Sequence, residues 1–483
     1  PARANIAPQI AAAASADTSN VTTQIAAIWS AILGTQNISP SDNFFDIGGH
    51  SLLATRLSAE IASHFDIDIN VADIFSYPSI AALAQFIEDT DLHKKALPAI
   101  KAVSRSAAAE TKFPLSFNQQ RLWFIYKMQP TAASYNMPTA LKLRGHIELS
   151  AFNQAVAAIF KRHDILRTVI SEDGEQAYQH CIEGLSHEAI NIETVEPQAL
   201  TDIISAEAQK PFDLTKAPLI RLRLLACADR SDETVLLVTM HHIISDAVSL
   251  QNMVKELAIA YYCFKENKPL ALPPLSIQYA DFALWQNQVL SGEHLQQQLN
   301  YWKKELDQAP LLLNLPTDKV RPAQQSHNGA IYNARLAAQT IKRLRSFAKK
   351  HHYTPFMLLL AAQQLLLARL AGEEDICIGV PIAGRHQKGS EDLIGFFVNA
   401  LIIRSRFDHN PSVADFFQLV KKQVLAGFAH QDAPFEQVIE HCQVKRSPAF
   451  NPIAQVGFNY ITEESNIIDN LANELAGIEI ESL

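Results

Sequence analysis

The chain has 483 residues, 48% of them hydrophobic and 19% charged, so it is long enough for about three globular domains and is not disordered. Its formal net charge of −9 argues against a general nucleic-acid binder, which carries a basic surplus. The charge is uneven: residues 1–90 contain two basic and nine acidic residues, a net charge of −7, and the rest of the chain carries only −2. We therefore expect a small acidic domain beside a nearly neutral large one.

Cysteine usage and apolar runs predict the compartment. The five cysteines are scattered, odd in number and never in a CxxC pair, which is typical of free thiols and not of a disulfide framework or a zinc site. The most apolar long stretch, residues 356–370, is interrupted by Gln363, Gln364 and Arg369, which predicts a core helix instead of a membrane span. No signal peptide is recognised at the start. We expect a cytoplasmic protein that binds neither metal nor membrane.

The first ninety residues predict a linker and a small helical domain. Residues 1–17 are rich in alanine and are typical of a linker from an upstream domain. Apolar residues at helical spacing then predict four helical segments: residues 21–34, a helix that opens at Ser51, a short turn over residues 71–75 and a helix that begins at Pro78. This pattern favours a small all-α four-helix bundle over residues 18–90.

Ser51 follows a glycine pair and opens a predicted helix. On local chemistry alone it is an N-cap, although a phosphate on its hydroxyl would gain from the helix N–H groups and dipole. The stretch DNFFDIGGHSLLATRL closely resembles the phosphopantetheine-attachment motif of peptidyl carrier proteins in nonribosomal peptide synthetases. The resemblance implies that Ser51 carries the covalent 4'-phosphopantetheine cofactor. It also implies that four neighbouring residues shape the loop read by the partner phosphopantetheinyl transferase: Asp46, Gly48, Gly49 and His50.

A second linker over residues 91–112 leads into an alternating pattern of strands and helices, which predicts an α/β layered domain. Strands are expected over residues 219–228, 234–242, 375–384 and 399–407. Helices are expected over residues 248–264, 295–306 and 356–370.

His241 and His242 stand at the end of the most apolar predicted strand, and Asp246 follows four residues later. Because neighbouring side chains of a strand point to opposite faces, one histidine is expected to face a cavity and the other to face packing. The alternative is a pair of histidines satisfied by core hydrogen bonds, which is the commoner situation for an isolated pair.

Seven blocks resemble the condensation domain of the same synthetases. In the family's order they are LSFNQQRLWF, KRHDILRT, MHHIISDAVS, YADFALW, IGFFVNALIIR, HQDAPFE and KRSPAFNP. The resemblance implies a two-lobed, chloramphenicol-acetyltransferase-like domain over residues 113–483, with the lobes divided near residues 285–325 and the histidine pair in a tunnel between them. Because family members continue further, the second lobe is expected to lack its C-terminal end.

The family transfers a carrier-tethered acyl group to the α-amine of an acceptor aminoacyl carrier, which forms a peptide bond. The resemblance implies that His242 acts on this amine, either as a general base or by positioning it. We assign His241 and Asp246 to supporting structure and expect Asp246 to pair with Arg385. Helix capping is expected of Ser249.

The family motif HHxxxDG has glycine where this chain has Ala247, and we expect the change to be tolerated. Ser245 is a further candidate hydrogen-bond donor. Asn399, Gln431 and Asp432 are expected to support the site where the lobes cross. Four residues are expected to brace the fold: Arg121, Trp123, Arg162 and Arg167.

The resemblance also implies partners: an upstream adenylation domain, a downstream adenylation domain and a downstream acceptor carrier. The first block looks like the subtype that accepts an L-configured donor. Two alternatives stay open. One is an epimerisation domain, which shares the histidine motif and follows a carrier. The other is a non-catalytic, condensation-like platform that recruits a modifying enzyme.

Overall fold

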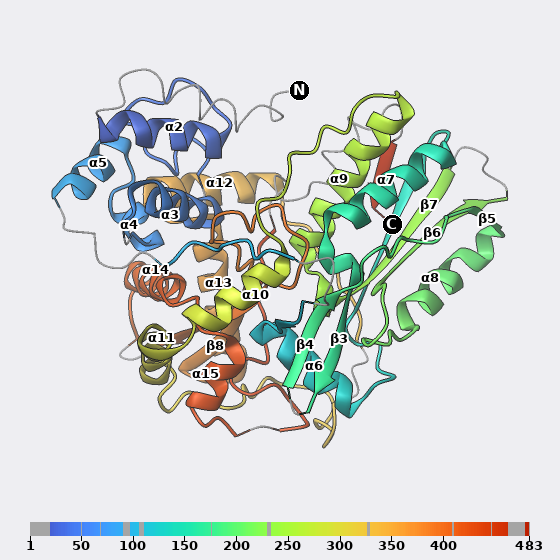
Figure 1. The fold of residues 1–483 in the computed structure, drawn as a ribbon. Coiled ribbons are helices and arrows are strands. Elements are labelled where there is room, and N and C mark those ends of the chain that lie inside the picture. Colours follow the sequence, from blue (N-terminus) through green and yellow to red (C-terminus); the bar gives the residue numbers. More distant parts are fainter. Residues whose placement is uncertain are drawn as a thin grey trace. The chain divides into compact units, whose positions relative to one another are not determined.

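The computed structural model describes residues 20–49, 51–67, 69–89, 97–105, 111–174, 176–228, 233–325, 329–407, 410–445, 447–461 and 479–482. Contacts divide the chain into two compact units (Figure 1). The first comprises Pro1–Ala99, Gly292–Lys388 and Asn399–Tyr460, and the second comprises Ile100–Ser291, Gly389–Val398 and Ile461–Leu483. Residues 389–398 therefore interrupt the first unit to join the second, and we call them the crossing segment.

The first unit begins with an N-terminal bundle, residues 20–89. Its helices are α2 (Val21–Leu33), α3 (Ser51–Phe65), α4 (Val71–Ser76) and α5 (Ile80–Asp89). Their apolar side chains meet in one core, where the rings of Trp29 and Phe44 pack edge to face at 5.0 Å. Gly34 ends α2 in the left-handed conformation that glycine adopts without strain. The predicted four-helix bundle is present.

The last helix of the N-terminal bundle begins later than predicted. α5 starts at Ile80, so Pro78 lies before the helix instead of in its first turn. The Pro78 carbonyl accepts a hydrogen bond from Phe44 N at 2.7 Å, which ties this residue to the preceding loop. Ser79 Oγ accepts one from Ala82 N at 3.2 Å and supplies the cap that proline cannot.

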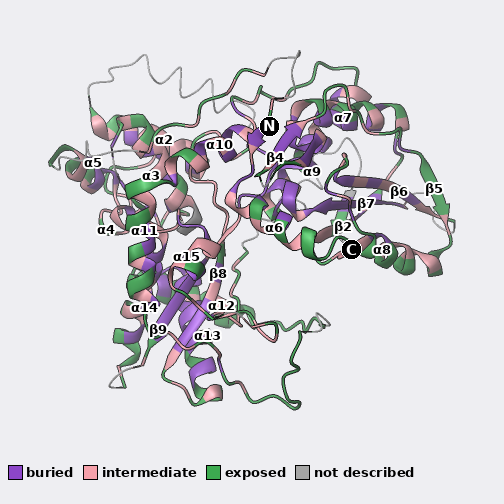
Figure 2. Ribbon diagram, turned by 60° about the horizontal axis from the view of Figure 1, so that its bottom comes forward, coloured by how far each residue is buried: buried purple, intermediate pink, exposed green. Residues whose placement is uncertain are grey.

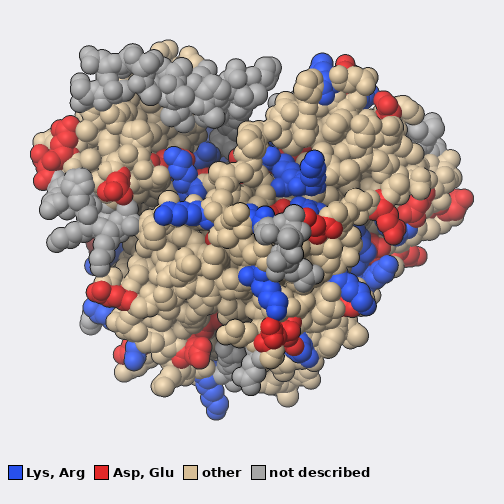
Figure 3. All heavy atoms as spheres, viewed as in Figure 1, with Lys and Arg blue, Asp and Glu red and all other residues tan. Residues whose placement is uncertain are grey.

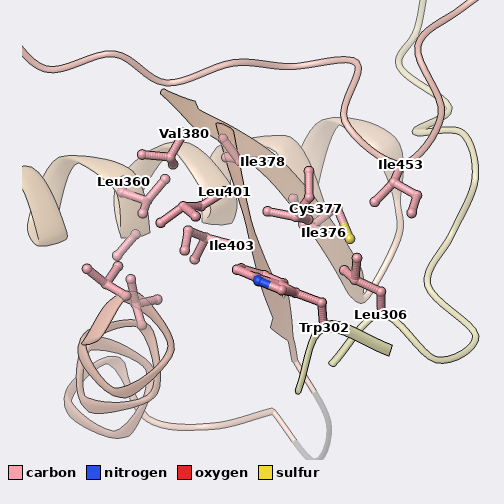
Figure 4. Packing of buried hydrophobic residues seen from close by; sticks show 14 of the residues in the cluster. Trp302, Leu306, Leu360, Ile376, Cys377, Ile378, Val380, Leu401, Ile403 and Ile453 are labelled. Carbon is pink, nitrogen blue, oxygen red and sulfur yellow. The ribbon is translucent and has the colours of Figure 1, made fainter. Parts of the chain in front are cut away.

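The remainder of the first unit packs helices around a two-stranded antiparallel sheet. Its elements are α11 (Gly292–Glu305), α12 (Ala338–Lys350), α13 (Pro355–Ala371), β8 (Asp375–Ile382), β9 (Asn399–Arg406), α14 (Val413–Ala429) and α15 (Phe435–His441). The β-branched Ile376, Ile378 and Val380 favour the strand conformation of β8 and are buried. They share one core with Trp302 of α11 and Leu360 of α13 (Figure 4).

The second unit is built on a five-stranded sheet in the order β10-β2-β7-β6-β5. Its strands are β2 (Asn136–Arg144), β5 (Ile192–Val195), β6 (Ile220–Cys227), β7 (Glu233–His241) and β10 (Glu479–Ser482). Neighbours pair antiparallel except β5 and β6, which are parallel. The apolar run that the sequence singles out is β7, the central strand, and it is buried along almost its whole length (Figure 2).

Helices cover both faces of this sheet, because alternate side chains of β7 are apolar on both sides. The helices of the second unit are α6 (Phe117–Met128), α7 (Leu149–Arg162), α8 (Leu200–Gln209), α9 (Ala247–Lys265) and α10 (Tyr279–Val289). Leu236 faces Tyr261 of α9, which lies beside α7. Leu237 packs on the opposite face against Ile203 of α8. The predicted α/β layering is present.

A smaller sheet of the second unit, in the order β1-β4-β3, consists of β1 (Phe113–Pro114), β3 (Thr168–Asp173) and β4 (Gln176–Cys181). Part of the predicted second linker is fixed on this unit. Val103 N donates to Asp281 at 3.1 Å, and Arg105 pairs with Asp164 at 3.0 Å and with Asp281 at 3.1 Å. The described residues of this segment are therefore not a free connector.

All five cysteines are free thiols. Within the described ranges, no single helix has both the length and the apolar character needed to cross a membrane. The pair α12 and α13 meets that length and composition test only jointly, across a bend of 110°.

Candidate active site

The central strand β7 delivers the histidine pair. His241, its last residue, is buried, and its ring lies 6.0 Å from that of Phe212. Its Nδ1 accepts a hydrogen bond from Ile243 N at 3.1 Å. Burial, together with His242 and Arg221, lowers the pKa of His241 to about 3, so this ring is neutral at physiological pH. His241 is the histidine that faces packing.

His242 leaves the strand and begins the 3-10 turn η3 (His242–Ile244), where it is half-buried. Its Nδ1 lies 2.7 Å from the carbonyl oxygen of Ser245. Because a carbonyl only accepts, Nδ1 carries the hydrogen, and the neutral ring has its lone pair on Nε2. The ring of Phe396 packs against the imidazole, with centroids 4.4 Å apart and planes at 51°. The site thus presents one tautomer, with Nε2 able to accept a proton.

Asp246 caps the helix that follows the histidines. Its carboxylate accepts from Ser249 N at 2.7 Å, from Ser249 Oγ at 2.7 Å and from Phe397 N at 3.0 Å, and it is 3% exposed. The prediction that Ser249 caps this helix is wrong. Ser249 lies inside the first turn, so its N–H is one of the unpaired donors that the cap, Asp246, satisfies. The pairing of Asp246 with Arg385, a residue of the first unit, stays a prediction.

Ala247 is the first residue of α9. A position with helical backbone does not need glycine, and alanine has the higher helix propensity. The backbone at this position is therefore compatible with alanine, and continued activity with alanine stays a prediction.

The residues expected at the crossing of the lobes lie together within the first unit. Asn399 Nδ2 donates to the carbonyl oxygens of Gln431 at 3.0 Å and Ala433 at 2.8 Å, and its Oδ1 accepts from Phe435 N at 3.1 Å. The amide of Asn399 thus holds the loop before α15 through main-chain bonds. Its support of the site where the lobes cross stays a prediction.

Asp432, from the same loop, lies between two imidazoles. Its carboxylate is 3.2 Å from His294 Nε2 and 2.7 Å from His386 Nε2. Burial would raise the pKa of Asp432, but the two histidines outweigh it and lower that pKa. Burial would likewise lower the pKa of His386, and Asp432 reverses the direction. The cluster joins α11, the loop before α15 and the residues just after β8.

Three residues predicted to brace the fold do so through carboxylates. Trp123 donates to Glu172 at 2.9 Å, Arg162 to Glu256 at 3.0 Å and Arg167 to Asp164 at 2.7 Å. Arg121 is half-buried on α6.

Ser51, the candidate attachment residue, is the first residue of α3. Gly48 has φ 115°, a conformation that other residues rarely adopt. A Cβ on Gly49 would lie 2.3 Å from the ring of Phe44, so the glycine pair is required for the chain to turn over this ring. His50 lies outside the described residues. The amino end of a helix suits a phosphate ester, so these residues fit a phosphopantetheine arm.

The N-terminal bundle contacts the rest of the first unit through an acidic loop and two helices. Asp46 lies 3.7 Å from Lys349 of α12, and Glu60 of α3 lies 3.8 Å from Lys388. Lys421 of α14 lies 5.7 Å from the ring centre of Phe75 in α4. Figure 3 shows further acidic side chains at the outer edge of the N-terminal bundle, over α5.

Sequence reasoning missed the crossing segment as part of the site. It singled out Asn399 from the block IGFFVNALIIR and passed over Phe396, which contacts His242 directly. The sequence contained a signal for this segment, because two adjacent phenylalanines after a glycine are unusual in a connection between strands.

Comparison with family models gives two matches. A model described as a phosphopantetheine attachment site matches residues 23–87, and a model described as a condensation domain matches residues 109–480.

Curated relatives include one of the linear gramicidin synthase polypeptides of Brevibacillus parabrevis, which is 36% identical over 95% of this chain and 9% of its own length. Malpibaldin synthetase of Mortierella alpina is 37% identical over 95% of this chain and 8% of its own length. The chain thus spans less than a tenth of the length of these relatives.

Among solved structures, the X-domain from teicoplanin biosynthesis is 27% identical, with a TM-score of 0.71 over 80% of this chain and 84% of that one. The first condensation domain of the CDA synthetase shares the fold, with 14% identity and a TM-score of 0.63 over 77% of this chain and 87% of that one. The expected two-lobed fold class is confirmed. The chain belongs to the condensation-domain family of nonribosomal peptide synthetases and carries a phosphopantetheine attachment site ahead of its condensation domain.

Proposed function

We propose that this chain forms a peptide bond between an acyl group tethered to its own N-terminal bundle, through Ser51, and the α-amine of an acceptor aminoacyl carrier. The observation that carries the proposal is the fixed tautomer of His242, whose Nδ1–H is bound to the Ser245 carbonyl. A lone pair on Nε2 suits an acceptor for a proton of an attacking amine.

The chain's own residues perform three tasks in this reaction. Ser51 holds the arm, which when attached supplies an activated thioester. His242 Nε2 accepts a hydrogen bond from the attacking amine, as the carbon–nitrogen bond forms and the carbon–sulfur bond breaks. The proton lost by nitrogen ends on the departing sulfur. Asp246 and His241 keep the histidine loop in shape, Asp246 through Ser249 and the main-chain N–H of Phe397. Much of the rate gain comes from holding both tethered ends together.

Partners follow from this role: adenylation domains on either side, a downstream acceptor carrier and a phosphopantetheinyl transferase. We propose an L-configured donor from the form of the first sequence block. The five free thiols favour a reducing, cytoplasmic setting.

The test loads Ser51 with an aminoacyl phosphopantetheine, adds an acceptor aminoacyl carrier and follows the acceptor by intact mass. A dipeptidyl acceptor is expected. His242→Ala should slow its formation by about 10²- to 10⁴-fold, the usual contribution of a proton-transfer group. His241→Asn, which keeps an acceptor for Ile243 N, should retain the wild-type rate within a few-fold. Undiminished transfer by His242→Ala would remove His242 from the reaction.

Loading itself has a separate control. Ser51→Ala should gain no mass when incubated with a phosphopantetheinyl transferase and coenzyme A. A gain equal to one arm in this variant would place the attachment on another residue.

A second candidate function is a platform that recruits another enzyme. It is favoured by the likeness to an X-domain seen in complex with OxyB from teicoplanin biosynthesis, at 25% identity and a TM-score of 0.70. A loaded chain that transfers nothing, yet binds a modifying enzyme tightly, would support this reading. Inversion of the donor residue without transfer would instead support epimerisation.

A further inference from the structure

The crossing segment is fixed to the second unit at almost every peptide near His242. Asn252 Nδ2 donates to the Glu391 carbonyl at 2.8 Å. Ser249 Oγ lies 2.7 Å from the Gly395 carbonyl and accepts from Gly395 N at 3.0 Å. Such a stretch of irregular backbone is usually mobile when its polar groups face water. Here those groups are bound inside the protein, so the segment is a rigid support.

The end of the segment is held equally firmly. Tyr279 Oη donates to the Phe396 carbonyl at 2.8 Å, Asp246 accepts from Phe397 N, and Asn118 Nδ2 donates to the Val398 carbonyl at 2.9 Å. Gly395 is needed for this approach, because a Cβ there would lie 1.9 Å from the ring of Tyr279.

Two phenylalanines of the segment point to different neighbours. Phe396 is 4% exposed and packs against His242 at 4.4 Å. Phe397 is 2% exposed and packs against Tyr279 at 5.0 Å and Phe282 at 4.6 Å. Both are buried, and both have a main-chain group held by a hydrogen bond, but only the first touches the imidazole.

Among the described residues, the imidazole of His242 has one polar partner, the Ser245 carbonyl that Nδ1 binds. A single hydrogen bond of this kind leaves the ring free to turn about its Cβ–Cγ bond, a broad torsion, whenever the bond opens. The ring of Phe396 lies against the imidazole, with centroids 4.4 Å apart and planes at 51°, so a full turn of the imidazole would run into it. Because protein interiors resist displacement of packed rings, this contact excludes the other orientations.

We propose that Phe396 is a positioning residue: it holds the His242 imidazole in the one orientation in which Nδ1 meets the Ser245 carbonyl and Nε2 points to the reacting amine. The inference rests on the proposed function of His242 and names a residue outside the histidine motif. Phe396 thereby raises the fraction of molecules whose His242 imidazole has this orientation. It should therefore change the rate of transfer more than the binding of the acceptor carrier.

The test compares Phe396→Leu with Phe397→Leu in the full chain loaded on Ser51. Both variants remove one buried aromatic ring from the crossing segment, so a general loss of packing affects both. Phe396→Leu should lower the single-turnover transfer rate by about tenfold or more, which is within the range caused by misplacing a reacting group. The acceptor-carrier concentration that gives half the maximal rate should stay within about twofold of wild type. Phe397→Leu should stay within about threefold of wild type, and Phe396→Tyr, which keeps a ring, should recover most of the rate. Equal rates for the two leucine variants would overturn the proposal.

A second readout does not need turnover. In the chain labelled with ¹⁵N-histidine and assigned with His242→Asn, the His242 signals should report the Nδ1–H tautomer in wild type and in Phe397→Leu. In Phe396→Leu they should move toward a mixture of tautomers. A wild type that makes no dipeptide would refute the proposed function alone, and the tautomer comparison would then decide whether Phe396 positions His242. An unchanged tautomer in Phe396→Leu would refute the positioning role, whatever the activity.

Discussion

The two adjacent histidines use their ring nitrogens in opposite ways. Nδ1 of His241 accepts from Ile243 N, whereas Nδ1 of His242 donates to the Ser245 carbonyl. The first ring is therefore bound to the main chain in a buried neutral form, whereas the neutral second ring has its lone pair on Nε2, which none of the described residues binds. The two rings differ in this way because strand β7 ends between them, at His241, and His242 begins the turn η3.

The lowered pKa of His241 makes stability depend on pH. In the unfolded chain this histidine titrates near 6.5, and in the folded chain near 3, so the unfolded state binds the proton first as pH falls. Its contribution to stability is complete above about pH 6.5 and is lost below it, by about 2 kcal/mol between pH 7 and pH 5. Urea unfolding at these two pH values should show this loss in wild type and a smaller one in His241→Asn. An equal loss in both would assign the pH dependence to other groups.

At this scale the sequence predicts the position of the histidines and of Asp246, because a strand period and a fixed motif place them. It does not predict which of Asp246 and Ser249 is the cap. Both are good capping residues, and the choice depends on where α9 begins, which Asp246 decides by also accepting from Phe397 N, a residue about 150 positions away.

In the second unit, helices were predictable where apolar residues form one buried stripe. Strands were predictable where apolar residues form a short run or alternate with polar ones. β7 and α9 follow from that pattern, and their bounds differ from the prediction by a residue or two. The start of α5 was not predictable from Pro78, because the Phe44 N–H, distant in sequence, binds the proline carbonyl. The crossing segment has no periodicity at all. Its conformation is set by partners on α9, α10 and α6, and no local rule contains them.

Ser249 and Asn252 of α9 both hold the crossing segment, and Ser249 does so through its hydroxyl. Ser249→Ala would leave the buried Gly395 N–H without the hydroxyl oxygen that accepts from it, at a cost of about 1–3 kcal/mol in the free energy of unfolding. Ser245→Ala is the matched control, because Ser245 is equally buried but its hydroxyl meets, among the described residues, only the sulfur of Met137 at 3.5 Å. Denaturant unfolding should rank Ser249→Ala as clearly less stable than Ser245→Ala. The reverse ranking would show that the join contributes little.

On the scale of the whole chain, composition alone distinguishes an acidic bundle from a nearly neutral remainder. In the structure, acidic residues of that bundle pair with lysines elsewhere in the first unit. Lysines from α12 and from the end of the β8 region face acidic residues of the N-terminal bundle. The sequence could not identify these pairs, since any of the chain's basic residues would satisfy the same overall charge balance.

Reversing one of these charges should loosen the contact. Lys349→Glu places a carboxylate opposite Asp46. Because both side chains are well exposed, the change should weaken the contact by no more than a surface ion pair contributes, up to about 1 kcal/mol. This corresponds to about a fivefold change in the ratio of molecules with and without the contact. Dyes on α5 and α14 should report a larger mean separation at low salt and a difference that vanishes at high salt. Lys350→Glu changes the same net charge at the next position. A shift as large in Lys350→Glu would mean that total charge, and not this pair, controls the contact.

Strand β10 closes the edge of the five-stranded sheet beside β2, and Glu481 reaches Arg144 across 337 positions of sequence. During synthesis, β2 and β7 leave the ribosome long before their last neighbour does. Until then the unpaired N–H and C=O groups along that edge of β2 hydrogen-bond to water or to a strand of another chain. Completion of this sheet therefore waits for a segment 337 residues beyond β2, and the open border needs chaperone protection during that interval.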